Sequence, residues 1–271
     1  MSYKIIVLDL DGTLMSSKNE ILPETKEALI KAQQNGLKVV LASGRPTVGL
    51  LKAVKALRLD EFGGYTLSFN GGRIINVQTN ERIYDRSLPP EVCHELYDLS
   101  REMKINIMAY EEESIITTDD DEYIQIESRI NEMPINRVNC FKESVVSSSV
   151  KCLATGDPEH IAIVEKQVIE RLGDRLSICR SMPFFLEFMP QNINKAYSLQ
   201  KLLDHLELDK SELIACGDGY NDLTMVEFAG LGVAMGNAVD EVKEKANFIT
   251  TSNDENGIAK VLEKFVFQSV N

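Results

Sequence analysis

The sequence predicts an α/β protein, with a doubly wound parallel-sheet core and an inserted α+β domain. Two observations support this fold class. Apolar strand patterns alternate with helical patterns at both ends of the chain, and between them strand patterns follow one another with fewer helices. Strands that alternate with helices form right-handed β-α-β units, which build a parallel sheet covered on both faces. The chain has 271 residues, 44% of them hydrophobic, and is long enough for two domains with cores of their own.

The first part of the chain alternates strand and helix patterns regularly. Residues 5–8 are four apolar residues in a row, which indicates a strand buried on both faces. Pro23 and Gly36 delimit a helix, because proline favours the first turn of a helix and glycine its end. The predicted elements are, in order, a strand over residues 5–8, a helix over 23–36, a strand over 37–42, a helix over 46–57 and a strand over 65–69.

The pattern changes near residue 84, where strands come closer together. The stretch 111–122 holds seven carboxylates and no basic residue, and we expect it to form a solvated hairpin rim, since runs of like charge usually face water. The predicted elements are a helix ending near residue 103, strands over 105–110, 114–118 and 150–155, a helix over 158–172, and strands over 176–180 and 184–189.

The first pattern returns near residue 189. The predicted elements are a helix over 195–206, a strand over 212–218, a helix beginning near 221, a strand over 231–235, a helix over 239–246, the apolar run 247–250 and a last helix ending near 265. We therefore expect a discontinuous core made of residues 1–83 and 189–271, with residues 84–188 inserted as a second domain.

Composition excludes several classes of partner. The net charge of −13 disfavours a sequence-independent nucleic-acid binder, which needs clustered lysine and arginine. No apolar run reaches the length of a membrane span, and Asp9 interrupts the first run before it could act as a signal-peptide core. Five cysteines, never spaced C-x-x-C, favour buried thiols in a reducing compartment. We expect a cytoplasmic protein that binds neither nucleic acid nor membrane.

Two aspartates stand where the first strand ends, in the sequence DLDG. If the extended geometry persisted to Asp11, its side chain and that of Asp9 would lie on the same face. Two unit charges about 4 Å apart repel by about 4 kcal/mol at an effective dielectric near 20. Either one carboxyl group is protonated or a cation lies close by, unless both are simply solvated turn residues.

Four polar clusters fall at the carboxyl ends of predicted strands or at a nearby helix start, where ligands of open parallel sheets collect. Each has an ordinary alternative as a turn, cap or solvated residue. Together they provide oxygen ligands for a hard cation, a hydroxyl group, backbone N–H groups and one positive charge, which a phosphoryl group with magnesium requires. The clusters are Asp9 with Asp11, Ser43 with Gly44, Lys195, and Asp218 with Asn221 and Asp222.

The motifs DLDGT, ASGR, NINKA and GDGYND, in this order and spacing, resemble the four motifs of the haloacid dehalogenase (HAD) superfamily of phosphohydrolases. The large insert between the second and third motifs, together with FNGG and GVAMGNA, resembles the Cof-type sugar-phosphatase branch, which has a type IIB cap. The resemblance implies a Rossmann-like catalytic core. It also implies that residues 84–188 form an α/β cap domain that selects the substrate.

The resemblance also implies roles for the acidic residues. Asp9 would be the nucleophile that forms an aspartyl phosphate, and Asp11 would protonate the leaving oxygen and then deprotonate the attacking water. The role of Asp11 requires a proton on its carboxyl group. Magnesium would be held by the Asp9 carboxylate, the Asp11 backbone carbonyl and Asp218, with Asp222 orienting the metal's waters.

The remaining implied roles concern the phosphate group. Ser43 and the Gly44 amide, with Lys195, Asn221 and the Leu10 amide, would bind its oxygens. The sequence leaves two nearby residues open: Asn70 could line the site or only form a turn, and Arg45 could contact substrate or lie at the surface. 

The predicted function is Mg²⁺-dependent hydrolysis of small phosphorylated metabolites, with sugar phosphates as the expected class, by a monomer or homodimer. A phosphomutase of the same superfamily would use the same aspartates. A phosphorelay receiver, which is not an enzyme, also combines acidic residues, magnesium, a hydroxyl group and lysine. Receivers are much shorter, and the large insertion and the aspartate two residues after the nucleophile, Asp11, disfavour this class.

Overall fold

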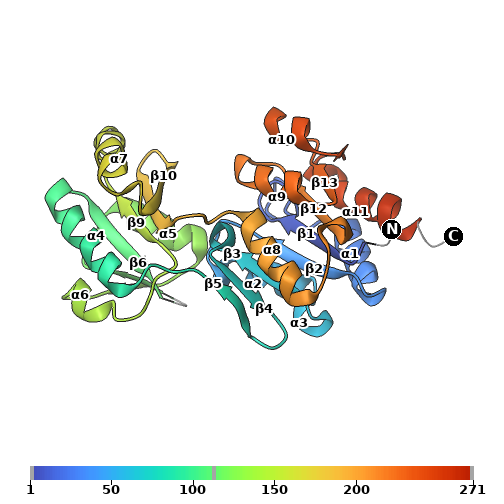
Figure 1. Ribbon diagram of the computed structural model, residues 1–271, viewed down its shortest axis with the longest axis horizontal. Helices are drawn as coiled ribbons and strands as arrows, with labels where there is room; N and C mark the ends of the chain where they lie inside the picture. Colours follow the sequence, from blue (N-terminus) through green and yellow to red (C-terminus); the bar gives the residue numbers. More distant parts are fainter. Residues whose placement is uncertain (1–2, 112–113, 269–271) are drawn as a thin grey trace. The chain divides into compact units, whose positions relative to one another are not determined.

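The computed structural model describes residues 3–111 and 114–268, which fold as two compact units (Figure 1). One unit combines residues 1–84 with 194–271, and the other comprises residues 85–193. The first boundary lies one residue after the expected position and the second lies five residues after it. The last strand of the inserted unit ends at Pro190, within this second boundary.

The discontinuous unit is built on an eight-stranded sheet. Its strands are β1 (Ile5–Asp9), β2 (Lys38–Ala42), β3 (Tyr65–Ser68), β4 (Arg73–Asn76), β5 (Arg82–Asp85), β12 (Leu213–Gly217), β13 (Leu231–Ala234) and β14 (Phe248–Ile249). They lie in the order β14-β13-β12-β1-β2-β3-β4-β5. Pairing is parallel from β14 to β3, and β4 is antiparallel to β3. All five residues of β1 are buried, as its apolar sequence predicts for a central strand.

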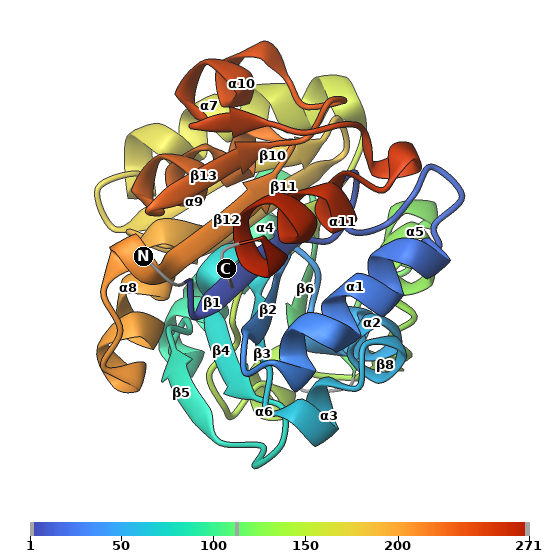
Figure 2. The same cartoon turned by 90° about the vertical axis from the view of Figure 1, so that its right-hand side faces the viewer.

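Helices cover both faces of this sheet. They are α1 (Pro23–Gln34), α2 (Leu51–Ala56), α3 (Leu59–Phe62), α8 (Lys195–Leu206), α9 (Leu223–Phe228), α10 (Asp240–Lys245) and α11 (Gly257–Leu262). Helices α1 and α11 contact each other on one face, whereas α8 and α9 lie on the other (Figure 2). The doubly wound core is therefore confirmed. Every parallel strand delivers its carboxyl end to the same edge of the sheet, which brings the loops after β1, β2 and β12 together.

Three parts of this unit differ from the sequence prediction, one of which is the short helix α3, which was not predicted. The β4–β5 hairpin was not predicted, because Arg73, Arg82 and Asp85 interrupt the apolar pattern. Strands near the edge of a sheet are only partly buried, so they can form without a continuous run of apolar residues. The helix predicted over residues 46–57 begins instead as a 3-10 turn, Thr47–Leu50, before α2. 

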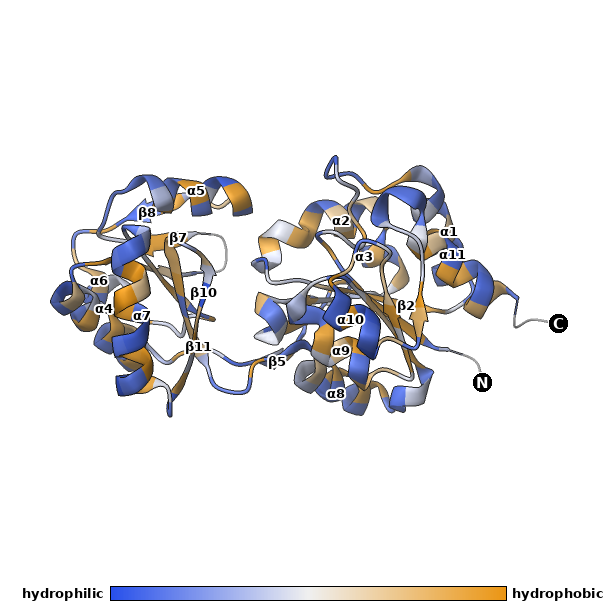
Figure 3. Ribbon diagram, turned by 90° about the horizontal axis from the view of Figure 1, so that it is seen from above, coloured by the Kyte–Doolittle hydropathy of each residue, from blue (hydrophilic) through white to orange (hydrophobic). Residues whose placement is uncertain are grey.

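The inserted unit has an α+β architecture, as predicted. Its elements are α4 (Pro90–Met103), β6 (Asn106–Tyr110), β7 (Ile115–Thr117), α5 (Glu122–Asn131), β8 (Ile135–Arg137), α6 (Phe141–Ser144), β9 (Cys152–Thr155), α7 (Pro158–Leu172), β10 (Leu176–Met182) and β11 (Phe185–Pro190). The sheet order is β10-β11-β9-β6-β7-β8, antiparallel except between β7 and β8. Helices α4 and α7 share an apolar core with this sheet, and hydrophilic and hydrophobic residues alternate along both (Figure 3). Ile163 and Ile169 of α7 are exposed.

The expectation of a solvated rim over residues 111–122 is wrong for two of its aspartates. Residues 112–113 lie outside the described part of the chain. Asp119 accepts a hydrogen bond of 2.8 Å from Arg101, and Asp121 caps the start of α5. Both therefore have structural partners, which the charge pattern alone does not show.

The cysteines agree with the sequence prediction. All five are free thiols, and Cys93, Cys152 and Cys216 are buried. Within residues 3–111 and 114–268, no helix is both long and apolar enough to span a membrane.

Candidate active site

Asp9 and Lys195 form a buried ion pair at the carboxyl edge of the core sheet. Asp9 is the last residue of β1 and is 5% exposed. Lys195 is the first residue of α8 and is 0% exposed. Its Nζ donates to Asp9 Oδ1 at 2.5 Å, to Asp222 Oδ1 at 2.6 Å and to the Ala42 carbonyl at 3.0 Å. All three ammonium hydrogens therefore have acceptors, and the side chain is held in one position.

The start of α8 places Lys195 by local interactions. The Asn194 side chain caps the helix by accepting a hydrogen bond of 2.9 Å from the backbone N–H of Tyr197. A cation at the first helical residue opposes the helix dipole. The position is therefore unfavourable for a structural lysine, and the carboxylates of Asp9 and Asp222 compensate for it.

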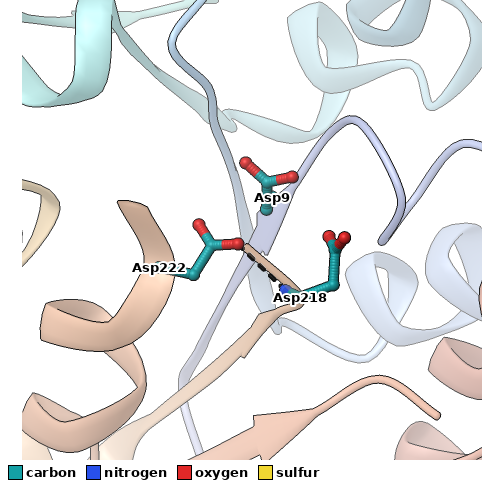
Figure 4. Close-up of side chains that lie close together, drawn as sticks. All are labelled: Asp9, Asp218 and Asp222. Carbon is teal, nitrogen blue, oxygen red and sulfur yellow. Dashed lines mark hydrogen bonds between the residues drawn. The ribbon is translucent and has the colours of Figure 1, made fainter. Parts of the chain in front are cut away.

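Asp222 connects the lysine to the GDGYND loop. One of its oxygens accepts from Lys195, and the other accepts from the backbone N–H groups of Asp218 at 2.9 Å and Gly219 at 3.0 Å. Figure 4 shows the hydrogen bond from the Asp218 N–H to Asp222, together with the carboxylates of Asp9, Asp218 and Asp222. One oxygen from each of the three carboxylates lies within 4.8 Å of the other two. The carboxyl end of β1 and the loop after β12 thus bring three carboxylates close together.

Asp218 approaches the backbone of the loop that follows β1. Gly12 has a φ of +82°, and a Cβ at this position would lie 2.3 Å from Asp218 Oδ2, so only glycine fits. The hydroxyl of Thr13 donates to Asp218 Oδ1 at 2.7 Å. Thr13 was not singled out from the sequence, although it is the last residue of the DLDGT motif.

Burial governs the electrostatics of this cluster. It raises the pKa of Asp9 to about 8 against the opposing effect of Lys195, and the charges of Asp222 and Asp218 add to the rise. Burial also raises the pKa of Asp218, although its hydrogen bond from Thr13 acts in the other direction. For Lys195, burial alone would lower the pKa, but the two neighbouring carboxylates outweigh it and raise the pKa.

Asp11 lies outside the buried cluster. The strand ends at Asp9, and the chain then turns, with Met15 N–H donating to the Leu10 carbonyl at 2.9 Å. The shared face that extended geometry would produce is therefore absent. The Asp11 side chain is 54% exposed, and both of its oxygens accept from Arg45, from Nε at 2.9 Å and Nη2 at 2.5 Å. Any acid–base role of Asp11 requires this pair to open toward the substrate.

The residues expected to bind phosphate form a second group beside the carboxylates. Ser43, which is buried, follows β2, and its hydroxyl accepts from the Arg45 N–H at 3.1 Å. Asn221 is exposed and donates from Nδ2 to Asn70 Oδ1 at 3.2 Å. A Cβ on Gly44 would lie 3.1 Å from Asn70 Nδ2, so the loop after β2 also reaches Asn70. The loop after β2 and the GDGYND loop thus meet at Asn70.

Asn237 is a second residue that sequence reasoning did not single out. Its side-chain amide donates to the Gly12 carbonyl at 2.8 Å, and its oxygen accepts from the Asn253 N–H at 3.0 Å. It therefore ties the loop after β1 to the segments that follow β13 and β14. The signal that could have found it is its place in the GVAMGNA motif.

Comparison with known proteins decides the family. The family model described as haloacid dehalogenase-like hydrolase matches residues 6–262. The chain belongs to this family. The hydrolase is similar to a solved haloacid dehalogenase-like hydrolase from Bacteroides thetaiotaomicron, with 46% identity, a TM-score of 0.92 and coverage of 97% of this chain and 99% of that chain.

Two further similarities concern phosphatases. The solved HAD subclass IIB sugar phosphatase BT4131 shares 26% identity with this hydrolase, at a TM-score of 0.77, over 97% of this chain and 98% of that one. The 5-amino-6-(5-phospho-D-ribitylamino)uracil phosphatase YcsE of Bacillus subtilis is 30% identical over 98% of this chain and 97% of its own. The predicted family and fold class are confirmed, and this hydrolase is a phosphatase, an enzyme that acts on phosphate monoesters.

Proposed function

We propose that this hydrolase is a Mg²⁺-dependent phosphatase of small phosphorylated metabolites, with sugar phosphates as its substrate class, and that Asp9 is its nucleophile. The observation that carries the proposal is the buried Asp9 carboxylate, oriented by Lys195 and flanked by Asp218 and Asp222. A carboxylate nucleophile divides one difficult displacement at phosphorus into two easier ones.

The donor set fits a magnesium ion. Its side-chain ligands would all be oxygens, and three carboxylates beside one ammonium leave two negative charges without compensation when all are ionised. Asp9, Asp218 and the Asp11 backbone carbonyl would hold the ion. Asp222 would not contact the ion directly but would orient its waters, because its oxygens already accept from Lys195 and two backbone N–H groups. When bound, the ion would offset the negative charge of the phosphoryl group.

The chain's own residues account for the bond changes. Asp9 attacks phosphorus, the bond from phosphorus to the ester oxygen breaks, and Asp11 gives its proton to the leaving oxygen. Water then attacks phosphorus, Asp11 takes a proton from that water, and the bond to Asp9 breaks to release inorganic phosphate. Lys195 keeps Asp9 oriented and stabilises negative charge in both steps.

Binding of the phosphate oxygens is assigned to the second group of residues. Ser43 has a hydroxyl hydrogen for which no described residue is an acceptor, and it can donate to a phosphate oxygen. Lys195, Asn221 and the backbone amides of Leu10 and Gly44 complete the proposed set. The inserted unit would then select the leaving group, as a cap domain.

The substrate class is supported by two relatives. The names of BT4131 and YcsE describe a sugar phosphatase and a phosphatase of a phosphorylated ribityl compound. Both names point to a phosphate on a polyhydroxylated carbon chain. Sugar and polyol phosphates are therefore the compounds to test first.

The experiment is a screen of sugar, polyol, nucleotide and aryl phosphates with added Mg²⁺, with EDTA, and with EDTA followed by excess Mg²⁺. Phosphate release should require Mg²⁺, disappear after chelation and return when the ion is restored, because the buried carboxylates then regain their counter-charge. Activity that survives thorough chelation would contradict the metal assignment. Isomerised substrate without net phosphate release would identify a phosphomutase instead.

Asp11→Asn should separate substrates by their leaving group. Loss of proton donation should slow sugar-phosphate hydrolysis about 10²- to 10⁴-fold, a typical contribution of general acid catalysis. Hydrolysis of p-nitrophenyl phosphate, whose leaving group needs no proton, should fall much less in its first step. Single-turnover release of p-nitrophenol measures this step. Equal losses for both substrates would show that Asp11 does not act as the acid.

A further inference from the structure

The loop after β3 has an unusual backbone. Three consecutive residues have positive φ angles: Phe69 at 53°, Asn70 at 54° and Gly71 at 104°. A left-handed conformation is uncommon for residues other than glycine, and for a bulky side chain such as Phe69 it is a clear outlier. Such strain persists only where the surroundings hold it, and it gathers at functional sites. The contacts of the loop show what the strained backbone places.

The loop is bound to the two elements that carry the phosphate-binding candidates. The backbone N–H of Phe69 donates to the Arg45 carbonyl at 3.0 Å, and that of Asn70 donates to the Ser43 carbonyl at 3.0 Å. On the other side, Ser198 of α8 donates from its hydroxyl to the Gly71 carbonyl at 2.6 Å. The backbone of Asn70 is thus fixed between the loop after β2 and the helix that begins at Lys195.

The Asn70 side chain has one end occupied and one end free. Its Oδ1 accepts from Asn221 Nδ2 at 3.2 Å, which fixes the orientation of the amide. Its Nδ2 carries two N–H donors, and no described residue accepts from them. This nitrogen lies against Gly44, because a Cβ there would be 3.1 Å away. Two unused donors therefore stand between Gly44 and Asn221, both of which are assigned to phosphate.

We propose that Asn70 is a further phosphate-binding residue, whose Nδ2 donates to a phosphoryl oxygen of the substrate and of the product phosphate. The inference rests on the proposed function and adds a residue to its binding site. The strained loop would then serve to aim this amide, and Gly44 leaves room for it. Asn221 acts twice, because it binds phosphate and holds the Asn70 amide with its nitrogen toward the site.

The test uses two substitutions whose new residues tolerate the left-handed backbone conformation of Asn70. Asn70→Gly keeps a left-handed residue but removes the amide, and Asn70→Asp keeps the acceptor for Asn221 but replaces the donor with an anionic oxygen. Asn80→Gly is the matched control, since Asn80 also has a positive φ, of 58°, but lies in the turn between β4 and β5. Calorimetry with inorganic phosphate on the Mg²⁺-loaded protein measures binding without turnover.

The two Asn70 variants should weaken phosphate binding, the aspartate more strongly. Asn70→Gly should raise the dissociation constant roughly 10- to 100-fold, the effect of losing a hydrogen bond to a charged group. Asn70→Asp should weaken binding further through charge repulsion, and Asn80→Gly should bind as the wild type does. Thermal unfolding should show that all three remain folded. If Asn70→Gly does not fold, Asn70→Asp decides alone.

Three outcomes would overturn the inference. Wild-type phosphate affinity in both Asn70 variants would show that Asn70 only shapes the turn. Equal weakening by Asn70→Gly and Asn80→Gly would show a general structural effect. If the wild type neither binds phosphate nor hydrolyses any phosphate ester, the proposed function itself fails, which is distinguishable because the first two outcomes require an active wild-type enzyme.

Discussion

Asp9→Asn should abolish phosphatase turnover and leave the fold intact. Asparagine has nearly the shape of aspartate but cannot form the covalent bond to phosphorus, so kcat should fall by at least about 10⁴-fold, as when other covalent nucleophiles are removed. Lys195 keeps its second carboxylate partner, Asp222, so its charge stays compensated. Phosphate release under saturating sugar phosphate measures the first effect, and circular dichroism with thermal unfolding measures the second.

Asp60→Asn is the matched control for this substitution. Asp60 is exposed on α3, and the same chemical change there should leave turnover at the wild-type level. In the wild type, rapid quenching during turnover should trap a phosphoprotein that neutral hydroxylamine cleaves, as expected of an acyl phosphate, and Asp9→Asn should not form it. Near-normal activity of Asp9→Asn would remove the nucleophile assignment.

Lys195→Met should damage both activity and stability. Methionine keeps the unbranched stem of lysine without the terminal ammonium group, so the buried carboxylates of Asp9 and Asp222 lose their positively charged partner. Removing one partner of a buried ion pair typically costs roughly 3–5 kcal/mol of unfolding free energy, and losing a charge-stabilising donor lowers kcat by about 10²- to 10³-fold or more. Urea unfolding without divalent ions and steady-state kinetics with Mg²⁺ measure the two effects.

The structural part of this prediction has a sharp control on the same helix. Lys201 is exposed on α8, so Lys201→Met should change the unfolding free energy little and leave kcat unchanged. Added Mg²⁺ should recover part of the stability of Lys195→Met, because a cation again compensates the carboxylates, but it should not restore kcat. Full activity in Lys195→Met would contradict the proposed mechanism. Unchanged stability without metal would contradict the electrostatic account of the cluster.

The sequence predicted the regular parts of the fold because their signals are local. The bounds of α8 follow from the cap at Asn194 and the periodicity of its apolar residues, and β1 follows from its unbroken apolar run. The elements that were missed are the hairpin of β4 and β5 and the short elements α3, α5, β8 and α6. They lie where the apolar pattern of the sequence is incomplete. An edge strand is only partly buried, and a short helix can be stabilised by contacts with other parts of the chain, so neither shows a clear local pattern.

The site divides in the same way. The sequence predicted the residue types of the four motifs and the kind of chemistry they support. It could do so because each motif stands at the end of a predicted strand or the start of a predicted helix. Sequence spacing could not decide that Asp11 pairs with Arg45 outside the buried cluster, because that depends on where the strand stops and the chain turns.

What the sequence by itself determined about this protein is therefore its fold class, its family and the chemical groups available to phosphate. Only the tertiary structure decided which of those groups meet. Asp9 and Lys195 are 186 positions apart and touch because α8 begins beside the carboxyl ends of β1 and β2, where its first side chain reaches Asp9 and the Ala42 carbonyl. Asn70 meets Asn221 across 151 positions because β3 and β12 belong to the parallel part of the sheet and end at the same edge. Such contacts follow from the order of strands in space, which no local pattern of residues encodes.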